Sequence, residues 1–286
     1  MIKRSRKRAR AALAAPAAVF IAAVFAACAL GAELKTEESE PAESWITEDQ
    51  RERQAQQAPE TFDETPTPTD LDTAVSQAII SSNRDRRYEG NSGAFQTEAH
   101  VTLAEVESGD SVTVYAYALH LVYILENGAL HDAAGSAAPV AITFSSDGDG
   151  VYNLTEYWYP GEGGYYMPSI KEKFPEALWD KVDTQLYAAD CSAEALRKAQ
   201  NHFGLTDFAK PEITVLKPLE ISGGARPDWS EYLRVTDDTD GEIPEEDIYI
   251  FDANVDYGKP GKYAFDVIIR DKAGNENRSS FEVTVK

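Results

Sequence analysis

Four aspartates in the C-terminal part of the chain have residue types and spacing that suit a cation. Asp237, Asp238 and Asp240 stand close together, and Asp271 opens a later turn. Carboxylate oxygens from adjacent loops are the ligands that Ca²⁺ prefers. Asp-Gly and Gly-Asn sequences are also ordinary turn residues, and turn formation is the favoured explanation of these aspartates. We therefore predict no cofactor, with calcium, bound by the four aspartates, as the alternative.

A second candidate site is aromatic. Tyrosine and tryptophan residues stand on both sides of the glycine-rich loop 160–164, and a further tryptophan follows it. Aromatic faces stack on sugars or hold a peptide, but in a half-buried sheet they more often pack in the core. The sequence suggests a ligand-binding surface, with core packing as the alternative. Its candidate residues are Tyr157, Trp158, Tyr165, Tyr166 and Trp179.

A third group combines histidine with a carboxylate. Glu98 and His100 are two residues apart and therefore share one face of an expected strand, with His120 on a neighbouring strand. These residues could ligate a metal, but strand histidines more often form ordinary hydrogen bonds.

The sequence lacks the signatures of common enzyme classes. No His-Glu-x-x-His, Gly-x-Ser-x-Gly or Gly-x-Gly-x-x-Gly motif is present. Cys191 has no positioned histidine beside it, so we expect a small packed residue rather than a catalytic thiol. A hydrolase with Glu156 and Glu162 as paired carboxylates is the weakest alternative, because nothing sets their separation. We predict no catalytic residues and a protein that is not an enzyme.

The composition limits the possible partners. The chain has 286 residues and a formal net charge of −22, from 27 Lys+Arg and 49 Asp+Glu. Such an acidic body repels phosphate backbones, so nucleic acid is not an expected partner. A hydrophobic content of 43% is sufficient for packed cores. The length suggests about two domains, and two cysteines exclude a disulfide scaffold.

Residues 1–27 are typical of a secretory signal, with a basic segment followed by an apolar one. The sequence Phe25-Ala26-Ala27-Cys28 resembles the bacterial lipobox, with Phe25 where leucine is usual. This resemblance implies that Cys28 is lipidated and anchors the chain at the outer face of the cytoplasmic membrane. An uncleaved spanning helix and an ordinary cleavage site at residues 30–32 are the alternatives. In all three cases the remainder of the chain lies outside the cytoplasm.

Residues 28–70 are expected to form a disordered acidic tether. Thirteen acidic and three basic residues stand between positions 28 and 72, and apolar residues are few. Such a segment cannot bury enough apolar surface to fold.

Residues 71–206 predict an α+β domain of two layers. Apolar residues at helical spacing predict a helix over 71–84, and a helix beginning at Ser192 is expected to end at Gly204. A further helix is expected over 169–182, with a break or restart at Pro175. Asn127-Gly128 and Gly135-Ser136 are expected in a longer connection between two strands. The four antiparallel strands are predicted at 100–106, 111–125, 139–144 and 152–159.

This region resembles an uncharacterised extracytoplasmic domain of Gram-positive bacteria. That domain is also found at the end of BlaR-type membrane metallopeptidases. The resemblance implies an extracytoplasmic module and carries no catalytic residues. It rests on Thr97 to Val101, Val112 to Tyr115, Gly135 to Phe144, Gly150 to Trp158 and Tyr165 to Pro175.

Residues 208–286 predict an all-β sandwich. Apolar and polar residues alternate over 263–270 and 281–286, which indicates half-buried strands, and 271–275 is the turn between them. The runs 258–263 and 270–275, with residues 235–238, resemble bacterial immunoglobulin-like domains of surface proteins. That resemblance implies a spacer or an adhesive module.

These observations predict a non-enzymatic, membrane-anchored extracytoplasmic lipoprotein that binds a ligand or partner, or senses one, at the bacterial cell surface. A cell-wall component or an envelope protein is the expected partner. The main alternative is an adhesin or structural envelope protein acting through the immunoglobulin-like domain, and a wall-polymer hydrolase is less favoured. The sequence leaves the ligand, the oligomeric state and calcium dependence open.

Overall fold

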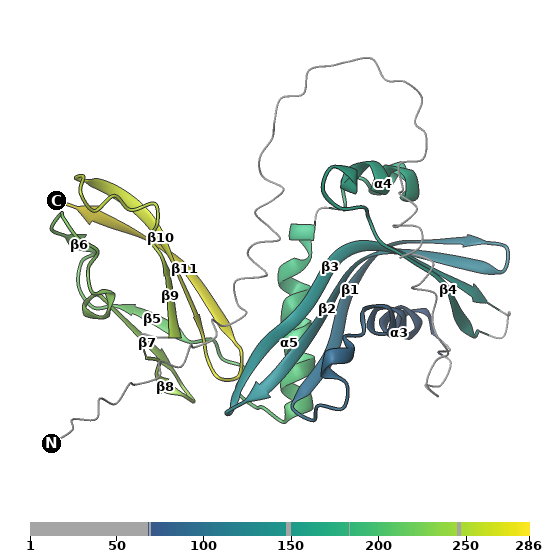
Figure 1. Ribbon diagram of the computed structural model, residues 1–286, viewed down its shortest axis with the longest axis horizontal. Helices are drawn as coiled ribbons and strands as arrows, with labels where there is room; N and C mark the ends of the chain where they lie inside the picture. The colour runs from purple at the N-terminus through teal and green to yellow at the C-terminus, as the bar shows by residue number, and fades with distance from the viewer. Residues whose placement is uncertain (1–67, 69, 147–149, 183, 245–246) are drawn as a thin grey trace, which may run out of the picture. The chain divides into compact units, whose positions relative to one another are not determined.

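Four long strands form the first sheet of the protein, in the order β1-β2-β3-β4 with antiparallel neighbours (Figure 1). The computed structural model describes residues 68, 70–146, 150–182, 184–244 and 247–286. The expected signal segment, Cys28 and almost all of the tether lie outside these residues. The strands are β1 (Ala94–Ser108), β2 (Ser111–Glu126), β3 (Ala129–Ser146) and β4 (Tyr152–Trp158).

The turn between β2 and β3 corrects one expectation. Asn127 and Gly128 have φ angles of 53° and 80°, and Glu126 pairs directly with Ala129. An Asn-Gly pair with two positive φ angles closes a two-residue hairpin. The expected longer connection is therefore wrong, and residues 129–138 continue strand β3 as far as the predicted segment.

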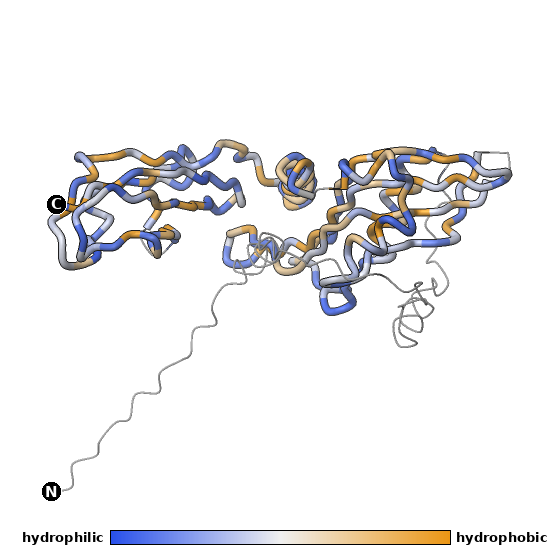
Figure 2. The backbone as a smooth tube through the Cα atoms, turned by 90° about the horizontal axis from the view of Figure 1, so that it is seen from above, coloured by the Kyte–Doolittle hydropathy of each residue, from blue (hydrophilic) through white to orange (hydrophobic). Residues whose placement is uncertain are grey.

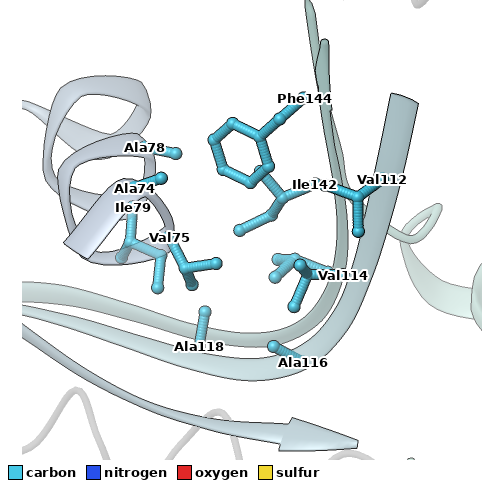
Figure 3. Packing of buried hydrophobic residues seen from close by; sticks show 11 residues of the cluster. Ala74, Val75, Ala78, Ile79, Val112, Val114, Ala116, Ala118, Ile142 and Phe144 are labelled. Carbon is cyan, nitrogen blue, oxygen red and sulfur yellow. The ribbon is translucent and has the colours of Figure 1, made fainter. Parts of the chain in front are cut away.

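Helices cover both faces of this sheet. Val112, Val114, Ala116 and Ala118 of β2 pack in the cluster of helix α3 (Leu71–Asn83), as Figure 3 shows. The alternate residues of β2, such as Tyr117 and Leu119, pack in the cluster of helix α5 (Ala188–Phe203). The sheet is thus the middle of three layers rather than one of two. Burial on both faces explains the nearly continuous apolar run of β2.

The helix boundaries follow local chemistry. Asp70 accepts a hydrogen bond from the Thr73 amide at 2.8 Å and begins α3 close to the predicted position. The region 169–182 contains α4 (Tyr166–Lys173), which ends where Phe174 precedes a proline and becomes extended, so the break expected at Pro175 is present. Only a short 3-10 turn, Glu176–Leu178, follows the proline. Helix α5 begins before Ser192, and Gly204, with φ 69°, ends it as predicted.

Two smaller sheets follow, in the orders β6-β11-β10-β9 and β5-β7-β8. Strands β6 and β11 are parallel, and the other pairs are antiparallel. The strands are β5 (Glu212–Val215), β6 (Glu220–Ile221), β7 (Leu233–Asp237), β8 (Gly241–Glu242), β9 (Ile248–Phe251), β10 (Gly261–Arg270) and β11 (Glu276–Val285).

One apolar cluster, which includes Trp229, Val235, Phe265, Ile269 and Val283, joins these two sheets. Hydrophobic and hydrophilic residues alternate along their strands, as Figure 2 shows by colour. The predicted period-two pattern of β10 and β11 is confirmed by alternating burial. The described residues are thus mostly β-structure in antiparallel sheets with few helices, compatible with a β-sandwich. Within the described ranges, no helix has the length and apolar character needed to cross a bilayer.

Candidate functional site

Three aspartates from distant parts of the sequence form a carboxylate cluster, which we define as Asp207, Asp237 and Asp271. One carboxylate oxygen from each lies within 4.8 Å of the others. Asp207 lies in the connection from α5 to β5, Asp237 is the last residue of β7, and Asp271 directly follows β10. Two of the three aspartates therefore lie in the second module, residues 208–286, and the third lies in the connection before it.

Two oxygen atoms of the carboxylate cluster are buried without a hydrogen-bond partner in the described structure. The Asp237 side chain is 7% exposed, and its Oδ1 accepts from the amides of Thr239 and Asp240 at 2.9 and 3.0 Å. Its Oδ2 has no partner, and neither has Oδ2 of Asp207. An unsatisfied buried oxygen is costly, and the cost is greater for a charged group. A shared proton or a bound cation would satisfy these two oxygens.

The carboxylates of the cluster repel one another, and the pKa of Asp271 is raised. Burial raises the pKa of the Asp271 carboxyl, the two hydrogen bonds from Asn275 lower it, and the charges of Asp207 and Asp237 raise it again. The resulting pKa is about 6, against an ordinary value of 3.8. A bound cation would reverse this balance by attracting all three carboxylates.

The donor set of the carboxylate cluster suits a hard cation. It offers carboxylate oxygens and neither thiolate nor imidazole, which favours Ca²⁺ or Mg²⁺ over zinc or copper. The smaller Mg²⁺ demands near-ideal octahedral geometry, whereas Ca²⁺ accepts irregular sets of oxygens. A cavity of about 280 Å³ reaches Asp237 and provides an approach. It is lined by Ala209, Lys210, Glu212, Thr236, Asp237 and Asp238.

The structure brings together two of the four aspartates that the sequence suggested as cation ligands. Asp237 and Asp271 belong to the carboxylate cluster. Asp240 instead accepts from the Lys272 amide at 2.8 Å and from its ammonium group at 2.9 Å. Asp238 is exposed and lines the cavity. Sequence reasoning missed Asp207, because it lies in the connection between the two predicted domains, where no strand pattern indicates a neighbour.

The turn 271–275 also contacts the first module, residues 71–206, and we call this contact the joint. All described residues belong to one compact unit. The Leu130 amide donates to the Lys272 carbonyl oxygen at 2.7 Å. The Gln200 side chain donates to the Ala273 carbonyl oxygen at 3.0 Å and to Oδ1 of Asn275 at 2.8 Å. The Arg270 guanidinium pairs with the Asp132 carboxylate. The carboxylate cluster therefore lies directly behind the joint.

The aromatic candidates are divided between two clusters. Tyr157 packs on the α3 side of the sheet, where its hydroxyl accepts from the Asn83 amide at 3.3 Å. Its neighbour Trp158 packs on the other face with Tyr166 and Trp179. Tyr165 is 53% exposed and belongs to neither cluster. Four of these residues are thus partly buried and pack against core clusters, and ligand binding by the set stays a prediction.

Glu98 and His100 form an ion network instead of a visible metal set. His100 Nδ1 lies 2.9 Å from Glu98 Oε2, and Lys198 donates to Glu98 Oε1 at 3.0 Å. Burial raises the pKa of Glu98, but these two hydrogen bonds outweigh it and hold the pKa below the ordinary value. His120 lies opposite Glu98 on β2, and burial lowers its pKa. The arrangement ties α5 to the sheet, which favours the hydrogen-bonding alternative for Glu98 and His100. Nε2 of His120 is buried without a hydrogen-bond partner in the described part of the chain.

Cys191 and Glu156, the other candidates for chemistry, are held in contacts that serve the fold. Cys191 is buried in α5, and burial raises the pKa of its thiol to about 11, so it remains protonated. Glu156 is paired with Lys173 through both carboxylate oxygens at 2.7 Å. Comparison with known proteins adds no assignment, because no family model matches the chain and no curated protein matches it in sequence.

Proposed function

We propose that the protein is a non-enzymatic extracytoplasmic lipoprotein that binds a divalent cation of the calcium class through Asp207, Asp237 and Asp271. The observation that carries this proposal is the Oδ2 atom of Asp237, which is buried beside two other carboxylates and has no partner among the described residues. A dication satisfies this oxygen and removes the mutual repulsion of the three carboxylates.

The class of protein rests on the two modules. A helix-covered sheet followed by a pair of small sheets supports an α+β extracytoplasmic domain followed by an immunoglobulin-like domain. The basic and apolar start of the chain, with Cys28, supports a lipid anchor. Binding or sensing at the cell surface, with a wall component or envelope protein as the partner, agrees with this architecture. An acidic exterior agrees with a solvated surface protein and disfavours nucleic acid.

The calcium concentration outside the cell determines the dissociation constant that such a site needs. Extracellular calcium modules bind with dissociation constants of about 10⁻⁴ to 10⁻³ M, because extracellular calcium is abundant. Three carboxylates that are partly satisfied by backbone amides are suited to this range.

Isothermal titration of the full chain with calcium chloride tests the proposal. We expect saturable binding by the wild type and its loss in Asp237→Asn, which keeps the size of the side chain and removes its charge. Asp256→Asn is the matched control, because Asp256 is exposed and caps a different turn through the Gly258 amide. Absence of saturable binding by the wild type, or binding by Asp237→Asn equal to that by Asp256→Asn, would contradict the proposal.

A further inference from the structure

The carboxylate cluster joins segments that also form the joint between the two modules. Asp207 belongs to the connection that leaves α5, and Asp271 opens the turn that contacts α5 and β3. Asp237 belongs to strand β7 of the second module. A ligand held by all three carboxylates would therefore fix the connection against the second module.

Asn275 links the carboxylate cluster to helix α5. Its Nδ2 donates to Oδ2 of Asp271 at 2.7 Å and to the Asp207 carbonyl oxygen at 3.3 Å. Its Oδ1 accepts from Gln200 at 2.8 Å. Asn275 is 6% exposed and Gln200 is 1% exposed, so water does not replace these hydrogen bonds in the closed joint. One side chain thus contacts both the Asp271 carboxylate and a residue of α5.

Charge opposes this arrangement when no cation is bound. Three carboxylates within 4.8 Å of one another repel, and burial weakens the screening of that repulsion. Movement of Asp207 away from the turn relieves the repulsion and gives its free Oδ2 access to water. The same movement takes the connection 204–211 away from Asn275 and weakens the joint.

We propose that a divalent cation bound by the carboxylate cluster closes the joint, so that calcium converts the two modules from a mobile pair to a fixed pair. This inference rests on the proposed function and adds a regulation to the same site. A ligand shifts such an equilibrium only through its different affinity for the two states. Here the difference arises because the complete set of three carboxylates exists only when Asp207 lies against the turn.

Distance measurements between two nitroxide labels test the inference. The labels are attached at Glu107→Cys and Lys259→Cys, both exposed and one in each module, in the full chain carrying Cys28→Ser. Cys191 is buried and is not expected to react. With calcium chloride we expect one narrow distribution of distances between the labels. With EGTA, which removes calcium, we expect a broad distribution. Equal distributions in both conditions, with calcium binding seen by titration, would overturn the inference and leave the proposed function intact.

The variant Gln200→Ala separates binding from closure. It removes the hydrogen bonds from α5 to the turn and leaves all three carboxylates. We therefore expect calcium binding to persist at lower affinity, because binding and closure are coupled, while the distance distribution stays broad. Asn201→Ala, at an exposed neighbouring position of α5, is the control and keeps the narrowing. If calcium narrows the distance distribution of Gln200→Ala as much as that of the control, the hydrogen bonds of Gln200 are not needed for closure of the joint. Failure of the wild type to bind calcium would overturn the proposed function itself.

Discussion

Gln200 of α5 and Asn275 of the β10–β11 turn form a buried hydrogen bond of 2.8 Å across the joint. Gln200 donates from the same nitrogen to the Ala273 carbonyl oxygen, so its loss leaves two acceptors without a donor. Amide side chains at buried positions stabilise a fold when both partners are satisfied and destabilise it when one is removed. The pair therefore fixes both the stability of the joint and its geometry.

We predict that Gln200→Ala lowers the free energy of unfolding by about 1–3 kcal/mol in excess calcium. Urea unfolding of this variant, of Asn275→Ala and of the double variant measures their coupling, which we expect to be about 0.5–3 kcal/mol. The exposed control Asn201→Ala changes stability by about 0.5 kcal/mol or less. Strictly additive effects of the two single variants would show that the hydrogen bond contributes nothing specific.

Asp271 gives the calcium-free chain a pH dependence. Because its pKa is about 6 in the folded chain and its ordinary value is 3.8, the folded state binds this proton more tightly than the unfolded state. Without calcium, the free energy of unfolding should therefore fall as the pH rises from 3.8 through 6. Above that range the ionised carboxylate is destabilising until a cation replaces the proton.

Urea titrations in EGTA and in calcium chloride measure this effect. At pH 7 and a calcium concentration of 100 times Kd, we expect a gain of about 2.7 kcal/mol. The gain should be smaller at pH 5, because calcium must then displace the proton. Asp237→Asn should lose the calcium gain, whereas Asp256→Asn should keep it. A calcium gain that does not change with pH would show that Asp271 is not a ligand.

His100 gives the first module a pH dependence of its own. Burial lowers the pKa of its imidazole, and the charge of Lys198 lowers it further. The adjacent Glu98 carboxylate and the charge of Asp72 raise the pKa by more than these two effects lower it. The pKa is therefore raised above 6.5. A raised histidine pKa stabilises the fold fully below the unfolded value, and this stabilisation is lost as the pH rises through the folded value.

We therefore expect the free energy of unfolding of the wild type to fall as the pH rises above 6.5, and we expect a smaller fall in His100→Gln. The measurement is urea unfolding in excess calcium, which separates this effect from that of Asp271. His131→Gln serves as the control, because His131 is exposed on β3. Equal slopes for the two variants would contradict a role of the Glu98–His100 pair.

Local patterns made much of the fold predictable. The helical spacing of Ala74, Val75, Ala78 and Ile79 and the alternation in β10 survive in the structure because each pattern is the burial pattern of one element. The extent of β3 was missed because a two-residue Asn-Gly hairpin was interpreted as part of a longer connection. The break expected at Pro175 is present, because a proline restricts the residue before it, and the segment after it forms only a short 3-10 turn.

The carboxylate cluster could be predicted only in part. Asp237 and Asp271 stand in turn sequences at strand ends, and the strand pattern places both ends near each other. Asp207 joins them because helix α5 ends at Gly204 and the connection returns along the second module, which depends on tertiary packing. Asp240 does not join the carboxylate cluster, because its carboxylate is paired with the ammonium group of Lys272. The aromatic residues are divided between two clusters because Tyr157 and Trp158 are adjacent and point to opposite faces of β4, whereas Trp158, Tyr166 and Trp179 pack against one cluster.

The lipid anchor is a prediction that depends on Cys28, which follows two alanines and a phenylalanine where leucine is usual. We expect labelled palmitate to enter the wild type in cells and to be lost from Cys28→Ala. Cys191→Ala should label like the wild type, because the buried thiol of Cys191 is protonated and inaccessible. Two or more acyl chains are needed for a stable anchor, so Cys28→Ala should also leave the membrane fraction. Equal labelling of wild type and Cys28→Ala would refute lipidation, and retention of an unlabelled chain in the membrane fraction would favour an uncleaved spanning helix.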